Sequence, residues 1–273
     1  MSDWNFNDEE LEALYLIDIY ENNITSFRVA EILDDPTLVP GSFDFQHLAD
    51  VHRYIFQDFP DKWIEQNEAT EEFFHYLQPE MLSFQPGQLR ESREPFNPIE
   101  KYRELAKGKL GSVSHYSCNN EEDLAHADQL LQQVQPSIIK NLPQEEIKAK
   151  MVDLYQELDF IHPFAEGNSR SLRTFTTLLA QEAGVNLQWS KLDHDALYAA
   201  RDMSLNQKTI DYYTQKSNED PFDTGMIERA SENLANLKSK GYKSMQALFE
   251  ETDNKLHNKQ LISNRNETPG MGF

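Results

Sequence analysis

With 273 residues, the chain is long enough to bury the core of one generous domain, alone or with appendages. Its 47 acidic and 25 basic residues give a formal charge of −22, which argues against a nucleic-acid-binding surface, because phosphate contacts need clustered Lys and Arg. The single cysteine, Cys118, excludes an intrachain disulfide and a cysteine-rich zinc site. No secretion signal and no stretch of roughly 20 apolar residues is found. We therefore expect a soluble, cytoplasmic protein without a membrane partner, although export as an effector stays open.

Two short helices are predicted near the N-terminus. Residues 8–20 begin with acidic side chains and then place apolar ones at helical spacing. Residues 26–33 predict a second helix, which the sequence Asp34-Asp35-Pro36 ends. We interpret residues 1–40 as an N-terminal helical extension.

A further helix is predicted within FDFQHLADVHRYIFQD, residues 43–58. It contains His47 and His52, which do not share a face as zinc-binding i, i+4 pairs do, so we predict structural roles for both. The aromatic-rich stretch at 63–77 is interpreted as core packing. Beyond residue 83, Pro and Gly break the helical pattern, whereas residues 110–116, LGSVSHY, alternate as a strand does.

Two well-marked helices flank a short polar loop in the second half of the chain. The first has Pro143 at its start and an apolar stripe made of Ile147, Met151, Leu154 and Leu158. The second ends near Gly184 and has an apolar face made of Leu172, Phe175, Leu178 and Leu179. Because both helices are anchored in a core, the loop between them is held rigid, as electrostatic catalysis requires.

The loop, within FIHPFAEGNSRSLRTF at 160–175, has the layout of a phosphate site. Gly167 and Asn168 allow a tight turn in which successive N–H groups form an anion-binding nest, and the next helix adds the positive end of its dipole. Arg170 and Arg173, spaced i, i+3, lie on one helix face and can hold the outer phosphates of a nucleotide.

Two further side chains of the loop suggest chemistry. Glu166 is placed to hold Mg²⁺ against the phosphates, and His162 to take a proton from an attacking hydroxyl. Each residue also has a plainer interpretation. Glu166 can cap the following helix, His162 can brace a helix end, and the two arginines can be surface charges paired with acids.

The sequence from His162 to Arg173, HPFAEGNSRSLR, resembles the Fic family signature HPFx[DE]GN[GK]RxxR. Residues 21–59 resemble the region leading into the Fic core, and residues 186–204 resemble the tail of that core. The resemblance implies an all-α helical bundle with a small β-hairpin flap near the active site. It also implies transfer of AMP from ATP to a Ser, Thr or Tyr hydroxyl of a target protein, with release of pyrophosphate. We place the Fic domain at residues 41–210 and a C-terminal helical extension with a disordered end at 211–273.

Ser169 departs from the signature, because the family usually has a second glycine at this position. A Cβ can crowd the phosphates there, whereas a hydroxyl can add a hydrogen-bond donor. We keep Ser169 among the ATP-binding residues and favour AMP transfer. The alternative is a catalytically weak Fic module that acts as a nucleotide-sensing or partner-binding protein.

The flap and the regulation of the protein are less well defined by the sequence. Either residues 86–92 or residues 110–116 can form the flap. Many Fic proteins are inhibited by a helix that carries [ST]xxxE[GN], but Glu21-Asn22 has Ile17 where Ser or Thr is required, and no complete motif is found. The resemblance therefore implies a separate antitoxin subunit that supplies this helix, or an effector that needs none.

Overall fold

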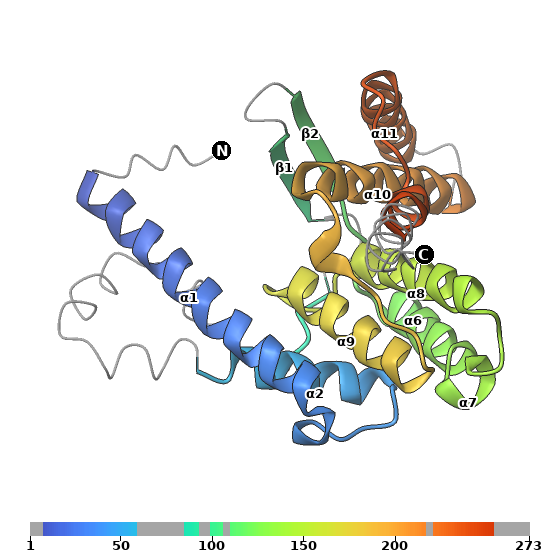
Figure 1. The fold of residues 1–273 in the computed structure, drawn as a ribbon. Coiled ribbons are helices and arrows are strands. Elements are labelled where there is room, and N and C mark those ends of the chain that lie inside the picture. Colours follow the sequence, from blue (N-terminus) through green and yellow to red (C-terminus); the bar gives the residue numbers. More distant parts are fainter. Residues whose placement is uncertain (1–7, 59–84, 93–98, 106–109, 217–220, 254–273) are drawn as a thin grey trace, which may run out of the picture.

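The computed structural model describes residues 8–58, 85–92, 99–105, 110–216 and 221–253. Helices dominate this part of the chain and one two-stranded sheet accompanies them, which confirms the predicted all-α fold with a small hairpin (Figure 1). The elements are α1 (Asp8–Asp34), η1 (Pro36–Leu38), α2 (Phe45–Phe56), β1 (Glu100–Leu105), β2 (Leu110–His115), α6 (Glu121–Gln133), α7 (Pro136–Ile139), α8 (Gln144–Ile161), α9 (Asn168–Glu182), η2 (Trp189–Lys191), α10 (His194–Lys216) and α11 (Pro221–Ser239), followed by helical residues 245–253. The aromatic stretch at 63–77 and the predicted disordered end lie outside the described residues.

The core forms where α8 and α9 pack against each other, with α6 against α8 and with α1 and α2 against α9. Every residue of the two predicted apolar stripes is buried. α2 adds a third apolar face, made of Leu48, Val51, Ile55 and Phe56. Burial of these faces fixes both helices that flank the polar loop, as the sequence predicted.

The N-terminal region is one continuous helix, so the prediction of two separate helices was wrong. Thr25, in the expected gap, is fully buried and donates its hydroxyl to the Glu21 carbonyl of its own helix at 2.7 Å. Such a bond satisfies the hydroxyl without breaking the helix. Packing of α1 on α2 and α9 outweighs the weak helix propensity of the intervening Asn and Thr residues.

The antiparallel hairpin pairs β1 with β2 in a register that runs from Glu100 opposite His115 to Leu105 opposite Leu110. The strand predicted at 110–116 therefore belongs to the hairpin. The other flap candidate, 86–92, contributes only an isolated bridge between Leu89 and Phe164. β2 packs on α10 and α11, which places the hairpin beside the end of α8 (Figure 1).

The helix α10 is much longer than the one expected at 193–203 and passes through the predicted domain boundary at residue 210. The division into 1–40, 41–210 and 211–273 stays a prediction. In the described part of the chain, no helix combines the length and apolar character that crossing a bilayer requires.

Candidate active site

The chain reverses between α8 and α9 through a loop that two left-handed residues bracket. His162 follows α8 with φ 53° and ψ 61°, and its N–H donates to the Leu158 carbonyl at 3.0 Å. Gly167 precedes α9 with φ 74° and ψ 2°. A left-handed residue ends a helix sharply, so His162 lies only a few residues from the N-terminus of α9.

Space as well as backbone conformation requires glycine at position 167. A Cβ added to Gly167 would lie 2.2 Å from Cζ of Phe56 in α2. The next residue closes the loop, because Asn168 Oδ1 accepts the Phe164 N–H at 2.9 Å and Nδ2 donates to the Phe164 carbonyl at 2.7 Å. Both polar atoms of the Asn168 side chain are bonded within the loop, so the role predicted for Asn168 in phosphate binding falls to its backbone N–H.

Arg90 holds the other side of the loop. Its guanidinium donates to the carbonyls of His162 at 2.5 Å, Ile161 at 3.0 Å and Ser117 at 2.8 Å. Its backbone N–H also donates to the Pro163 carbonyl at 2.9 Å. The last carbonyls of α8 lack partners within the helix, and a cation there is favourable to the helix dipole. Arg90 thus fixes the point at which α8 ends.

His52 has the structural role that the sequence predicted. Its Nδ1 accepts the Gly87 N–H at 2.8 Å, so the proton is on Nε2, which donates to the Glu166 carbonyl at 3.0 Å. The imidazole also stacks on Phe164, with ring centroids 3.9 Å apart. His47 is likewise structural: it is bonded to the backbone of Phe43 and Val39.

The neutral state of His52 predicts a loss of stability in acid. Burial lowers the pKa of His52 to about 4. The unfolded chain binds this proton from about pH 6.5 downward, so the stability falls between pH 6.5 and pH 4, by about 2 kcal/mol at pH 5. We expect chemical denaturation at pH 7.5 and pH 5 to show a larger loss for the parent than for His52→Gln. Equal losses in the two proteins would contradict this assignment.

His162 lies in the interior of the protein. Its side chain is 2% exposed, its ring centroid lies 3.9 Å from that of Tyr116, and neither ring nitrogen has a hydrogen-bond partner in the described part of the chain. Burial lowers the pKa of His162 well below its ordinary value, and the charges of Lys101, Arg201 and Arg90 act in the same direction.

The imidazole is therefore neutral at physiological pH, which is the form that a general base needs. The backbone of Asp159 opposes the shift in the pKa of His162 without reaching hydrogen-bond geometry. Tyr116 packs on one face of the ring and the His162 side chain is 2% exposed, so the surroundings of His162 have to open before a substrate hydroxyl can contact a ring nitrogen.

The N-terminus of α9 has no side-chain cap. Its first N–H groups have no acceptor within the helix, and this is the usual setting of an anion site. Burial raises the pKa of Tyr155 in α8, and the side chain of Ser169 opposes this shift.

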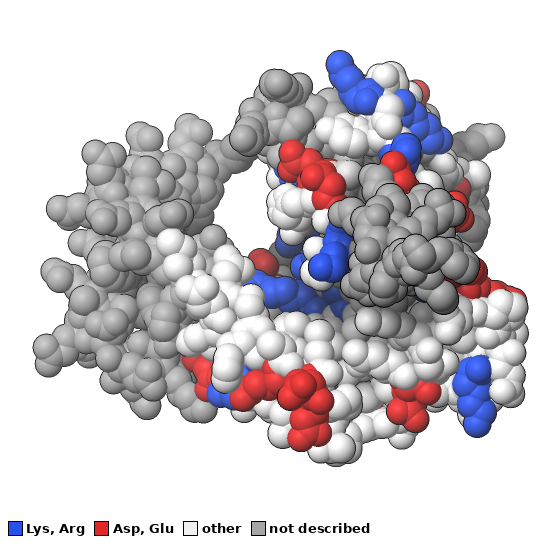
Figure 2. Space-filling view, in the orientation of Figure 1, with Lys and Arg blue, Asp and Glu red and all other residues white. Residues whose placement is uncertain are grey.

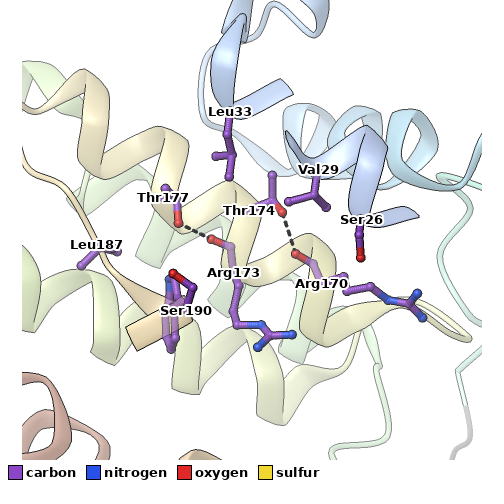
Figure 3. Close-up of a pocket in the computed structure, with 10 residues that line it drawn as sticks. Ser26, Val29, Leu33, Arg170, Arg173, Thr174, Thr177, Leu187 and Ser190 are labelled. Carbon is purple, nitrogen blue, oxygen red and sulfur yellow. Dashed lines mark hydrogen bonds between the residues drawn. The ribbon is translucent and has the colours of Figure 1, made fainter. Parts of the chain in front are cut away.

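Arg170 and Arg173 both line a cavity of about 320 Å³ (Figure 3). The cavity lies between α1, α9 and the segment around η2, and Val29 and Leu33 of α1 form part of its apolar wall. Arg173 donates Nε to the Ser169 carbonyl at 3.1 Å. The structure thus brings the two predicted arginines to one cavity, but His162 does not line it.

Arg170 is engaged by α1. Its guanidinium forms an ion pair with Glu21 and donates to the Thr25 hydroxyl at 2.7 Å and to Asn22 Oδ1 at 3.4 Å. Sequence reasoning rejected Glu21 because Ile17 stands where the inhibitory motif has Ser or Thr. The signal that could have found it is the Glu-Asn pair itself, although it falls in the gap between the helices predicted at 8–20 and 26–33.

Glu166 is exposed, and its carboxylate makes no ion pair within the described residues. No group of three or more His, Cys, Asp or Glu side chains that could hold a metal occurs in that part of the chain. Mg²⁺ commonly uses one or two protein carboxylates and completes its shell with phosphate oxygens and water. A single exposed carboxylate beside the α9 N-terminus fits that kind of site.

Known proteins resemble this chain across the loop and its flanking helices. The model of the Fic/DOC family matches residues 42–180. The protein adenylyltransferase VbhT of Bartonella schoenbuchensis is 24% identical over 169 residues, which are 60% of this chain and 26% of that protein. A protein adenylyltransferase of Bartonella henselae is 25% identical over 164 residues, with 59% and 26% covered. The match thus spans about a quarter of the length of these curated relatives.

Two solved structures from Bartonella are also similar. The BepC protein of Bartonella tribocorum, with bound AMPPNP, is 17% identical with a TM-score of 0.48, over 78% of this chain and 86% of that one. The N-terminal Fic domain of a VirB-translocated Bep effector protein of Bartonella quintana, with bound ADP, is 18% identical with a TM-score of 0.49, over 71% and 79%.

Proposed function

This chain belongs to the Fic/DOC family, and from that membership we propose that it transfers AMP from ATP to a hydroxyl side chain of a target protein, releasing pyrophosphate. The observation that carries the proposal is a neutral imidazole, His162, whose two ring nitrogens have no partner among the described residues and which ends α8 just before the uncapped N-terminus of α9. The names of the two curated relatives support the same reaction.

In the proposed reaction, the hydroxyl oxygen of the target forms a bond to the α-phosphorus of ATP. The bond from that phosphorus to the oxygen bridging the α- and β-phosphates breaks, and pyrophosphate leaves. His162 accepts the proton of the attacking hydroxyl, a contribution that is typically worth about 10²–10⁴-fold in rate. The surroundings of the imidazole have to open when the target binds, because the His162 side chain is 2% exposed.

The phosphates would be held by the α9 N-terminus and by the two arginines. The backbone N–H groups of Asn168 and Ser169 and the helix dipole serve the inner phosphates, whereas Arg170 and Arg173 bind the outer ones. Glu166 would hold Mg²⁺, which neutralises phosphate charge when it is bound.

The reaction can be tested with two labelled substrates. The protein is incubated with a cell lysate and ATP that carries the label on either the α- or the γ-phosphate. We expect label to reach a target protein only from the α position. Transfer from the γ position would instead identify a kinase, and transfer from neither would remove support for an enzyme.

A nucleotide-binding module with little catalysis is the second candidate. Two observations favour it: Tyr116 covers His162, and Glu21 already pairs with Arg170. This candidate predicts that the protein binds ATP in equilibrium dialysis but transfers no label to any protein.

The contact between Glu21 and Arg170 predicts that α1 restrains nucleotide binding within the same chain. A phosphate has to displace the Glu21 carboxylate to bind Arg170. Removing the charge with Glu21→Gln is therefore expected to lower the KM for ATP by about tenfold, equivalent to about 1.4 kcal/mol. Steady-state transfer from α-labelled ATP measures the change.

Glu31→Gln is the matched control, because it removes another paired carboxylate of α1. Glu31 pairs with Arg28 of the same helix, away from the loop. An unchanged KM in Glu21→Gln would show that α1 does not restrain the site. An antitoxin subunit that supplies an inhibitory helix in trans then remains the proposal for regulation.

A further inference from the structure

The hairpin presents a polar, positively charged face to the interior. Lys101 lies opposite Ser114 and Arg103 opposite Ser112, so all four side chains share one face of the sheet. Ser112 and Ser114 are buried, whereas Tyr102, on the other face, is 64% exposed. A small sheet normally turns apolar side chains inward. The buried Asp202 of α10 pairs with Arg103 at 3.5 Å and accounts for part of this polar face, but it does not pair with Lys101.

Lys101 lies near the proposed chemistry. Its Nζ lies 6.0 Å from the ring centroid of Tyr116, whose ring in turn packs on His162 at 3.9 Å. Burial lowers the pKa of Lys101, and the carboxylate of Glu166 on the loop opposes this shift. Lys101 therefore interacts with the loop as well as with the ring that packs on His162.

The other cations near His162 are already engaged. Arg201 makes a bidentate ion pair with Asp159, at 2.5 and 2.6 Å, and both side chains are buried. Arg90 donates to the carbonyls at the end of α8. Lys101, in contrast, forms no salt bridge within the described part of the chain, although it is half-buried. A half-buried ammonium without a carboxylate partner is costly unless an anion joins it.

Figure 2 shows several Lys and Arg side chains gathered near the middle of this face, in a molecule whose overall charge is −22. Such a local concentration of positive charge favours a polyanionic ligand. The motif arginines serve one end of that ligand, because they line the cavity beside α1. Neither of them is among the charges that act on His162.

We propose that Lys101 is a further substrate-binding residue, whose ammonium group binds the α-phosphate of the AMP that is transferred, at the His162 end of the triphosphate. The inference rests on the proposed function. A hairpin cation there would offset the negative charge on the non-bridging oxygens of the α-phosphate while the target hydroxyl attacks the phosphorus. It would also link the position of the hairpin to catalysis, since Lys101 reaches the phosphate only when β1 is docked.

The test compares Lys101→Met, which keeps the length of the side chain, with Lys101→Arg, which keeps the charge. Lys240→Met removes an exposed lysine after α11 and is the matched control. We expect Lys101→Met to weaken binding of ATP by about tenfold and to reduce kcat for AMP transfer further, whereas Lys101→Arg and Lys240→Met stay within about threefold of the parent. Circular dichroism confirms that each variant is folded.

The pH profile tests whether the charge of Lys101 acts on His162. The other charged groups facing Lys101 are Arg103 on β1, Glu166 in the loop, Asp159 in α8 and Arg201 in α10. Because Lys101 lowers the pKa of His162, its removal is expected to move the acidic limb of kcat to higher pH.

The outcomes separate this inference from the function on which it rests. If the parent transfers AMP and Lys101→Met matches it in ATP binding, kcat and pH profile, the role of Lys101 is overturned and the function stands. If the parent binds ATP without transferring AMP and Lys101→Met still loses affinity, the binding role stands and the enzyme does not. A parent that binds no ATP overturns both.

Discussion

Replacing His162 with asparagine is expected to reduce AMP transfer by about 10²–10⁴-fold, because the reaction loses its proton acceptor. Asparagine is the informative substitution, since position 162 has φ 53° and Asn tolerates this left-handed conformation better than other residues with a side chain. Transfer from α-labelled ATP under single-turnover conditions measures the effect on the chemical step.

ATP binding and thermal unfolding of His162→Asn are the controls, and both are expected to stay close to those of the parent. His162→Ala is a poorer probe, because alanine adds backbone strain at this position to the loss of the imidazole. If His162→Asn kept the transfer rate of the parent, His162 would not be the general base, and the proposed mechanism would be wrong.

Gly167→Ala is expected to cause the largest loss of stability of any small substitution in the loop. The left-handed conformation costs a residue with a Cβ about 1–2 kcal/mol. The clash with Phe56 adds about 1–3 kcal/mol, because overpacking forces the surrounding side chains or backbone to shift. Chemical denaturation of the parent and the variant measures the sum.

Gly184→Ala is the matched control for this experiment. Gly184 has φ +82°, but a Cβ there meets nothing within 4 Å, so only the backbone cost applies. Both substitutions reduce the entropy of the unfolded chain in the same way, and this term cancels between them. Equal destabilisation of the two variants would show that the Phe56 side chain moves aside without a loss of stability.

The sequence predicted the parts of the structure that depend on periodicity and on local chemistry. The apolar faces of α8 and α9, the turn at Gly167 and the structural roles of His47 and His52 follow from spacing and residue type. The match to the Fic/DOC family model confirms the family that the motif indicated. These features need no knowledge of distant contacts.

The features that escaped prediction all depend on contacts between distant segments. The break expected in α1 does not occur, because tertiary packing overrides the weak propensity around Thr25. β1, with the sequence EKYREL, has no apolar alternation that marks it as a strand. The cover of Tyr116 over His162 and the contact of Glu21 with Arg170 depend on the packing of the hairpin and of α1, which no local pattern encodes.

The bonds that hold the loop also determine when it can form during folding. His52 reaches the Glu166 carbonyl across 114 positions of the chain, and Arg90 reaches the Ile161 carbonyl across 71. Contacts between such remote positions are slow to form and are absent from a fragment that lacks one partner. A recombinant piece that begins after the hairpin would therefore contain the whole signature sequence and both of its helices, yet would lack the anchors that give the loop its shape.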